Sequence, residues 1–133
     1  MSDHELERIR LKKVELLLKQ QSVPKEIIMI QDEGEFNKLL IDFPEKIVII
    51  DFWAVWCSPC KIFAPVFKKL HQEYQNDFLF VKINVDDNPN IALKYRVSSI
   101  PTTVFLKRGK LLKSIVGSVN YTALKLILEQ FKI

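Results

Sequence analysis

The chain has 133 residues, 48% of them hydrophobic and 27% charged, and 20 Lys and Arg against 16 Asp and Glu give a net charge of +4. This length and apolar content favour one domain with its own core and exclude a disordered chain. Two cysteines are too few for a disulfide-stapled scaffold, and the mild charge gives no reason to expect nucleic acid as a partner.

The longest apolar runs fall far short of the roughly 20 residues that a membrane-spanning helix needs. The first residues contain early acids and no apolar stretch of the kind that opens a secretory signal. We therefore expect a cytoplasmic protein with no membrane partner.

The first predicted element is a helix over residues 5–21. Ser22, Val23 and Pro24 break its pattern, which predicts an N-terminal helical extension, residues 1–24, followed by a main domain, residues 25–133. The apolar side of the helix has to be buried somewhere, so it is a packing helix, a docking or self-association helix, or a solvated tail. Arg10 and Lys13 interrupt this side, which is formed by Leu6, Leu11, Val14, Leu17 and Leu18.

In the main domain, short apolar runs alternate with helical patterns. Asp32, Asn88 and Asn120 are the expected N-caps of three of the helices. Because βαβ connections join parallel strands and the last two strands form a predicted hairpin, the fold class is α/β, with a mixed central sheet and helices on both faces. The expected order is βαβαβαββα, with strands at 26–30, 47–54, 77–85, 102–106 and 111–116 and helices at 33–42, 59–75, 89–96 and from 121 onward.

The residues that carry chemistry are Cys57 and Cys60, which lie where a predicted buried strand is followed by a helix. Two cysteines three positions apart at a helix start can reach disulfide distance, and the helix N-terminus favours a thiolate there. Pro59 stiffens the first turn. We expect the Cys57 sulfur to be exposed and the Cys60 sulfur to be shielded, one helical turn further in.

A Cys-x-x-Cys pair beside a βαβ pattern indicates a thioredoxin-like redox motif. The chain resembles the thioredoxin family well beyond that pair, from about residue 26 to residue 131. The resemblance implies a thioredoxin fold and a thiol–disulfide oxidoreductase that reduces disulfides in partner proteins. The motifs that carry it are Asp51-Phe52-Trp53-Ala54, Trp56-Cys57-Ser58-Pro59-Cys60-Lys61, Ala64-Pro65, Lys82-Ile83-Asn84-Val85-Asp86, Ile100-Pro101-Thr102, Gly109 and Gly117.

The resemblance implies a role for each catalytic candidate. Cys57 is the attacking thiolate, and Cys60 is the resolving thiol that releases the reduced partner. Asp51 is a buried carboxyl under the cysteines; an acid in such an apolar strand has a raised pKa and accepts a proton near neutral pH. Lys82 is the neighbour that modulates this acid.

The resemblance also implies a substrate-binding surface. Trp56, Pro59, Ile100 and Pro101 form a flat apolar docking area, with Pro101 as the cis-proline opposite the cysteines and Ile100 pairing with an extended substrate segment. Ser58 stands between the cysteines where the commonest family motif has Gly, which affects redox potential and partner preference. No bound cofactor or metal is expected. The expected partners are disulfide-containing proteins and a thioredoxin reductase that supplies electrons from NADPH.

Two other functions remain open from the sequence. A disulfide oxidase or isomerase uses the same chemistry in an oxidising compartment. A binding or scaffold module uses the N-terminal helix to recruit a partner and does not need its cysteines. A zinc site is a weaker interpretation of the cysteine pair, because structural zinc needs four ligands. The chain has no second cysteine pair, and its two histidines, His4 and His71, lie in unrelated parts of the sequence.

Overall fold

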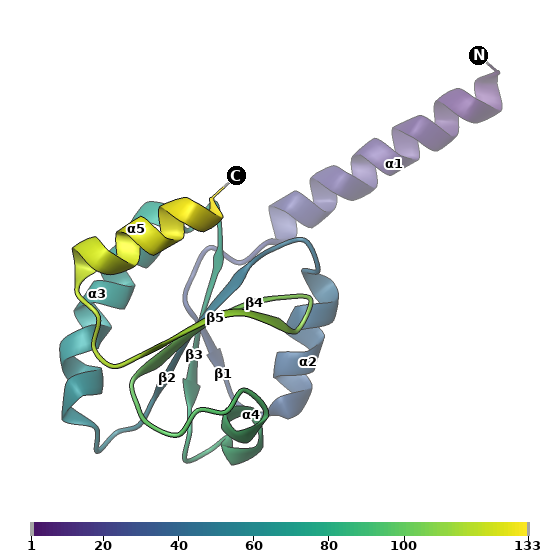
Figure 1. The fold of residues 1–133 in the computed structure, drawn as a ribbon. Helices are drawn as coiled ribbons and strands as arrows, with labels where there is room; N and C mark the ends of the chain where they lie inside the picture. Colours follow the sequence, from purple (N-terminus) through teal and green to yellow (C-terminus); the bar gives the residue numbers. More distant parts are fainter. Residues whose placement is uncertain (1, 133) are drawn as a thin grey trace.

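The computed structural model describes residues 2–132, without the side chains of residues 15–22 (Figure 1). The order βαβαβαββα after an N-terminal helix is confirmed. The helices are α1 (Asp3–Ser22), α2 (Glu33–Asp42), α3 (Ser58–Tyr74), α4 (Pro89–Lys94) and α5 (Tyr121–Phe131). The strands are β1 (Ile28–Ile30), β2 (Val48–Trp53), β3 (Leu79–Asn84), β4 (Thr102–Lys107) and β5 (Lys110–Val116).

The sheet is mixed, as expected, and its 5 strands lie in the order β1-β3-β2-β4-β5. β1 and β2 both run parallel to β3, whereas β4 runs antiparallel to β2 and β5 antiparallel to β4. β2 is therefore the central strand, and Ile49, Ile50 and Phe52 in it are fully buried. A strand buried on both faces explains why this segment is an almost unbroken apolar run.

Helices cover both faces of the sheet (Figure 1). One core layer packs α2 and α4 against the face that carries Ile50 and Phe52. The other packs α3 and α5 against the opposite face, where Phe63 and Phe67 of α3 meet Ile49 of β2. Because successive side chains of β2 point to opposite faces of the sheet, this one strand contributes residues to both core layers.

All three expected N-cap residues stand at the expected positions, and two of them make side-chain capping bonds. The Asp32 carboxylate accepts a hydrogen bond from Glu35 N at 2.9 Å, and the Asn120 side chain accepts one from Ala123 N at 2.8 Å. Asn88 is the N-cap of α4, with Pro89 at the first helical position, but its buried side chain makes no capping bond. Its Nδ2 instead donates to Asn84 O at 3.1 Å and ties the start of α4 to the end of β3.

The expected hairpin between β4 and β5 is present. Arg108 and Gly109 form its turn, with φ values of 54° and 77°. Two consecutive left-handed residues match the twist of the flanking strands, and glycine takes this conformation without steric cost.

The N-terminal helix α1 projects away from the sheet (Figure 1). Leu6, Ile9, Leu11 and Val14 are each at least 46% exposed, so α1 does not bury this part of its apolar side against the domain. Leu17 and Leu18 of the predicted apolar side lie outside the described side chains. The predicted boundary at residue 24 falls in the connection from α1 to β1 and stays a prediction. Among the described residues, no helix is long and apolar enough to cross a membrane.

The turn after α4 leads the chain into the segment that precedes β4. Arg96 N donates to Leu93 O at 3.0 Å, and Val97 N donates to Ala92 O at 2.9 Å. This bond pair is the Schellman motif, and it places Arg96 in the left-handed region with a φ of 56°. Glycine is the residue best suited to that position, because a Cβ atom is disfavoured there.

We predict that Arg96→Gly raises the free energy of unfolding by about 0.5–1 kcal/mol, because relief of the left-handed strain exceeds the entropy that glycine adds to the unfolded chain. Urea denaturation measures the change. As the control, Leu93→Gly at an exposed position inside α4 lowers stability by about 1 kcal/mol. A loss of stability in Arg96→Gly would contradict the prediction.

Candidate functional site

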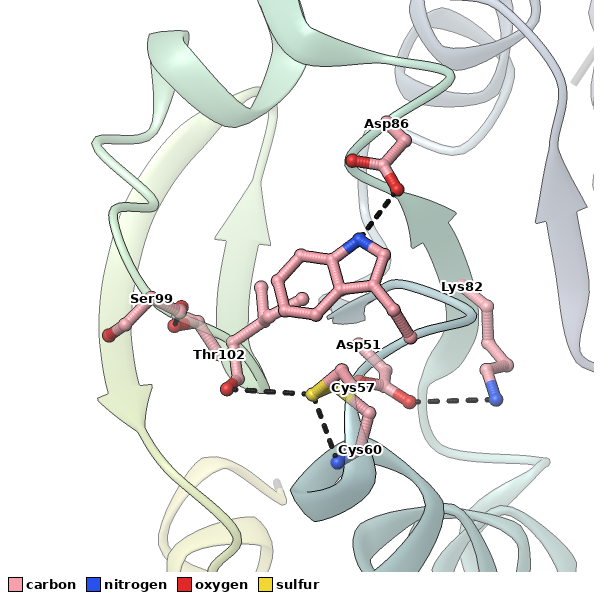
Figure 2. The surroundings of a disulfide bond; sticks show 9 residues. Asp51, Cys57, Cys60, Lys82, Asp86, Ser99 and Thr102 are labelled. Carbon is pink, nitrogen blue, oxygen red and sulfur yellow. Dashed lines mark hydrogen bonds and ion pairs between the residues drawn. A yellow bond between two sulfur atoms is a disulfide. The ribbon is translucent and has the colours of Figure 1, made fainter.

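The two cysteines lie at the junction of β2 and α3 (Figure 2). Cys57 is the N-cap of α3, and its Sγ accepts a hydrogen bond from Cys60 N at 3.2 Å. Ser58 and Pro59 form the start of the helix, and both are exposed. Cys57 and Cys60 are joined by a disulfide with their Cα atoms 5.3 Å apart. The helix start therefore holds the pair where it can open and close without moving the backbone far.

The expectation that Cys57 is exposed is wrong for the disulfide state. Cys57 is 3% exposed and Cys60 is 4% exposed. The reason is the segment before β4, which lies over the pair: the Cys57 sulfur is 3.7 Å from Ile100 O, and Ile100 packs against both cysteines. Only a small edge of the disulfide is accessible to a partner.

Asp51 lies in β2 beside the cysteines and is fully buried (Figure 2). Burial raises the pKa of Asp51 to about 6, and the charge of Lys82 partly opposes that rise. The Lys82 Nζ atom is 3.7 Å from Asp51 Oδ2, close enough for an ion pair but too long for a good hydrogen bond. The expected burial of Asp51 and its pairing with Lys82 are confirmed, whereas their catalytic roles stay predictions. The carboxyl can therefore exchange a proton near neutral pH.

Trp56 is 68% exposed beside the cysteines. Its indole Nε1 donates a hydrogen bond of 2.9 Å to Asp86 Oδ2, which fixes the ring on the surface (Figure 2). Sequence analysis gave Asp86 no role, although it lies in a motif that carries the family resemblance. Its backbone N donates to the Asn84 side chain at 2.9 Å, which holds the turn that presents its carboxylate.

Trp56 also lines a groove of about 400 Å³. Ile100 is half-buried at its edge, as expected for a docking surface. The cis peptide bond expected before Pro101 is present. Pro101 itself is buried, and its part in substrate binding stays a prediction. Thr102 Oγ1 donates to Ser99 O at 2.6 Å and closes the bend that precedes β4 (Figure 2). The groove is lined by Trp56, Val85, Val97, Ser98, Ser99 and Ile100.

His71 lies in the last turn of α3, at the opposite end of that helix from the cysteines. The ring of His71 makes a contact of 2.6 Å with Lys25 O and packs edge-on against Phe80. Within residues 2–132, no three His, Cys, Asp or Glu side chains gather as ligands for a metal ion. The site thus consists of a redox-capable cysteine pair, with a buried carboxyl and an apolar groove beside it.

Comparison with known proteins agrees with this geometry. The family model described as Thioredoxin matches residues 27–130. The chain belongs to the thioredoxin family. A thioredoxin from Synechocystis sp. is 39% identical over 99 residues, which cover 74% of this chain and 92% of that protein. A chloroplastic thioredoxin M5 from Oryza sativa is 36% identical over 104 residues, which cover 78% of this chain but 60% of that protein.

Solved thioredoxin structures show the same fold. Reduced thioredoxin from Schistosoma mansoni aligns with a TM-score of 0.73 at 36% identity and covers 80% of this chain and 98% of its own. Thioredoxin from Fasciola hepatica gives a TM-score of 0.73 at 32% identity, with 80% and 100% covered. The thioredoxin fold expected from the sequence is confirmed. Family and cysteine pair together make the chain a protein-disulfide oxidoreductase that acts on disulfide-containing proteins.

Asp51 makes the stability of this thioredoxin-family chain depend on pH. Its pKa is raised above the ordinary value of 3.8, so the folded protein holds the proton more tightly than the unfolded chain. The free energy of unfolding therefore falls as pH rises from about 4 to above 6, by up to about 3 kcal/mol. We predict that Asp51→Asn removes this fall, as measured by urea unfolding of the disulfide form at pH 4.5 and pH 8.

Asp87→Asn is the matched control, because Asp87 is exposed and carries the same charge. Its pH dependence is expected to follow that of the unmodified protein. An unchanged fall in stability between the two pH values in Asp51→Asn would show that another group causes it.

Proposed function

We propose that the protein is a disulfide reductase in which Cys57 attacks and Cys60 resolves. The observation that carries the assignment is the position of Cys57 as the N-cap of α3, where its sulfur accepts the Cys60 N–H. Both the N–H group and the partial positive charge of the helix N-terminus stabilise a thiolate. Cys57 also lies against Ile100 at the groove, so it is the cysteine that an extended partner segment meets first.

The reaction consists of two thiol–disulfide exchanges. The Cys57 thiolate attacks one sulfur of the partner's disulfide, forms a mixed disulfide and releases the other sulfur as a thiolate that takes up a proton. The Cys60 thiolate then attacks the Cys57 sulfur, which closes the Cys57–Cys60 disulfide and releases the second partner thiol. Two electrons and two protons pass from the cysteine pair to the partner.

Asp51 takes the proton from the Cys60 thiol in the second exchange. A pKa of about 6 leaves most of this carboxyl ionised at neutral pH while keeping it basic enough to accept a proton. Lys82, 3.7 Å away, stabilises the ionised form. This proton transfer raises the fraction of Cys60 present as the attacking thiolate.

The partner protein docks on the apolar surface around the cysteines. Trp56 and Pro59 are exposed on one side of the pair, and Ile100 supplies a backbone edge on the other. An extended segment of the partner adds to that edge by strand-like pairing. Ser58 is exposed between the cysteines, where it contacts the partner protein next to its disulfide. It also adjusts the redox potential of the Cys57–Cys60 pair.

The electrons come from NADPH through a thioredoxin reductase, and the protein itself needs no bound cofactor. We place the reaction in the cytoplasm, where reducing equivalents are supplied and protein thiols are kept reduced. Bacterial thioredoxins and chloroplastic thioredoxins both occur among the similar proteins. The scaffold alternative is not favoured, because a scaffold has no need of a disulfide-forming pair beside a buried acid.

The resolving step predicts a covalent intermediate. In Cys60→Ser the second exchange cannot occur, so mixed disulfides between Cys57 and partner proteins accumulate. Non-reducing electrophoresis with mass spectrometry detects them. The double variant Cys57→Ser with Cys60→Ser is the control and traps nothing. If Cys57→Ser alone traps partners and Cys60→Ser does not, the two roles are reversed.

The direction of the reaction predicts a low reduction potential. We expect the Cys57–Cys60 pair, equilibrated with a dithiol buffer, to have a reduction potential of about −270 mV, as reducing thioredoxins do. Trp53 and Trp56 flank the pair, so tryptophan fluorescence reports its redox state. A potential near about −120 mV, typical of a strong oxidant, would instead support the oxidase alternative.

A further inference from the structure

Buried polar atoms without a hydrogen-bond partner are concentrated at one place in this fold. Among the side chains that the structure describes, the buried polar atoms that lack a partner are Asp51 Oδ1 and Oδ2, Trp53 Nε1 and Thr103 Oγ1. Most buried polar groups are satisfied, because an unpaired group costs about 1–3 kcal/mol. The cluster therefore needs an explanation of its own.

The sheet register brings these residues together. Asp51 in β2 lies directly opposite Thr103 in β4 and beside Lys82 in β3. Residues opposite each other across antiparallel strands have Cβ atoms about 4.5–5.5 Å apart and point to the same face. Trp53, two residues after Asp51, shares that face. The Thr103 hydroxyl and the Asp51 carboxyl are thus neighbours that make no direct hydrogen bond, and one water molecule between them would connect the two groups.

The described surroundings of Asp51 offer its carboxylate few hydrogen-bond donors. Lys82 in β3 is its ion-pair partner, and at 3.7 Å it neutralises charge without making a good hydrogen bond. The helices that cover this face, α3 and α5, present Phe63, Leu124 and Leu128 to it, together with Cys60 at the helix start. Thr103 is fully buried, and its hydroxyl makes no hydrogen bond to any of the described residues.

We propose that the Thr103 hydroxyl holds the ionised Asp51 carboxylate through one bridging water molecule and so positions it to take the Cys60 proton. In this arrangement Thr103 acts through Asp51, so it is a positioning residue. The proposal rests on the proposed role of Asp51, and it adds the group that holds the carboxylate oriented.

The physical consequence is a balance around one carboxyl. Burial favours the neutral acid, whereas the Lys82 charge and the water-mediated hydrogen bond from Thr103 favour the carboxylate. Removing the hydroxyl removes only the last of these contributions. A β-branched residue of the same size at position 103 keeps the strand packing, so the electrostatic effect can be measured without a large change in the core.

The test compares three variants of the full chain. Thr103→Val deletes the hydroxyl at constant shape, and Thr103→Ser keeps the hydroxyl. Thr102→Val is the matched control, because it makes the same chemical change one residue earlier, where the hydroxyl donates to Ser99 O on the opposite face. Carbon-13 NMR follows the Asp51 carboxyl carbon from pH 4 to pH 9 in the disulfide form.

We expect Thr103→Val to raise the midpoint of the Asp51 titration by about one pH unit, the effect of losing one hydrogen bond to a charged group. Thr103→Ser and Thr102→Val are expected to titrate like the unmodified protein. The pH profile of disulfide reduction moves in the same direction in Thr103→Val. If Thr103→Val does not fold, Thr103→Ala against Thr103→Ser makes the same comparison.

An unchanged Asp51 titration in Thr103→Val would overturn the proposal. A Trp53→Phe variant that shifts the titration while Thr103→Val does not would overturn it in favour of the indole N–H as the donor. Because the titration is read in the disulfide form, its result does not depend on catalysis. Failure of the proposed function appears separately, as the absence of mixed disulfides in Cys60→Ser.

Discussion

One buried carboxyl in the central strand is the constraint on which the site depends. Asp51 lies in β2, between β3 and β4, with helices over both faces of the sheet. In such a place the charged form of an acid loses its water and is held only by the groups that the neighbouring strands supply. Lys82 from β3 is its ion-pair partner, and Thr103 from β4 lies directly opposite it, so the surroundings of the carboxyl depend on sheet register.

The same strand also delivers the cysteines. β2 ends at Trp53, and a short turn leads to Cys57 at the start of α3, so the redox pair is held directly beyond the acid. A separate segment completes the site: the Schellman turn at Arg96 and the bend before β4 bring Ile100 against the disulfide. Two stretches far apart in the chain therefore meet at one end of the sheet.

The N-terminal helix is attached at the other end. β1 and β2 both run parallel to β3, so the start of β1 and the end of β2 lie at opposite ends of the sheet. α1 enters at the former and the cysteines lie at the latter. The helix therefore leaves the docking surface around Trp56 and Ile100 uncovered, and its own exposed apolar residues, such as Leu11, stay clear of the redox pair.

Periodicity, capping residues and the motif around Cys57 and Cys60 were enough to predict the element order, the mixed sheet and the redox chemistry, because these depend on local spacing along the chain. The sequence did not reveal that Cys57 and Pro101 are buried or that Asn88 turns back to β3, because neighbours far away in the chain decide each of these. The Trp56–Asp86 bond and the pairing of Thr103 with Asp51 were missed for the same reason. Helix caps, turns and the cysteine motif depend on residues that are close in the sequence, whereas burial and cross-strand contacts exist only once the strands have paired.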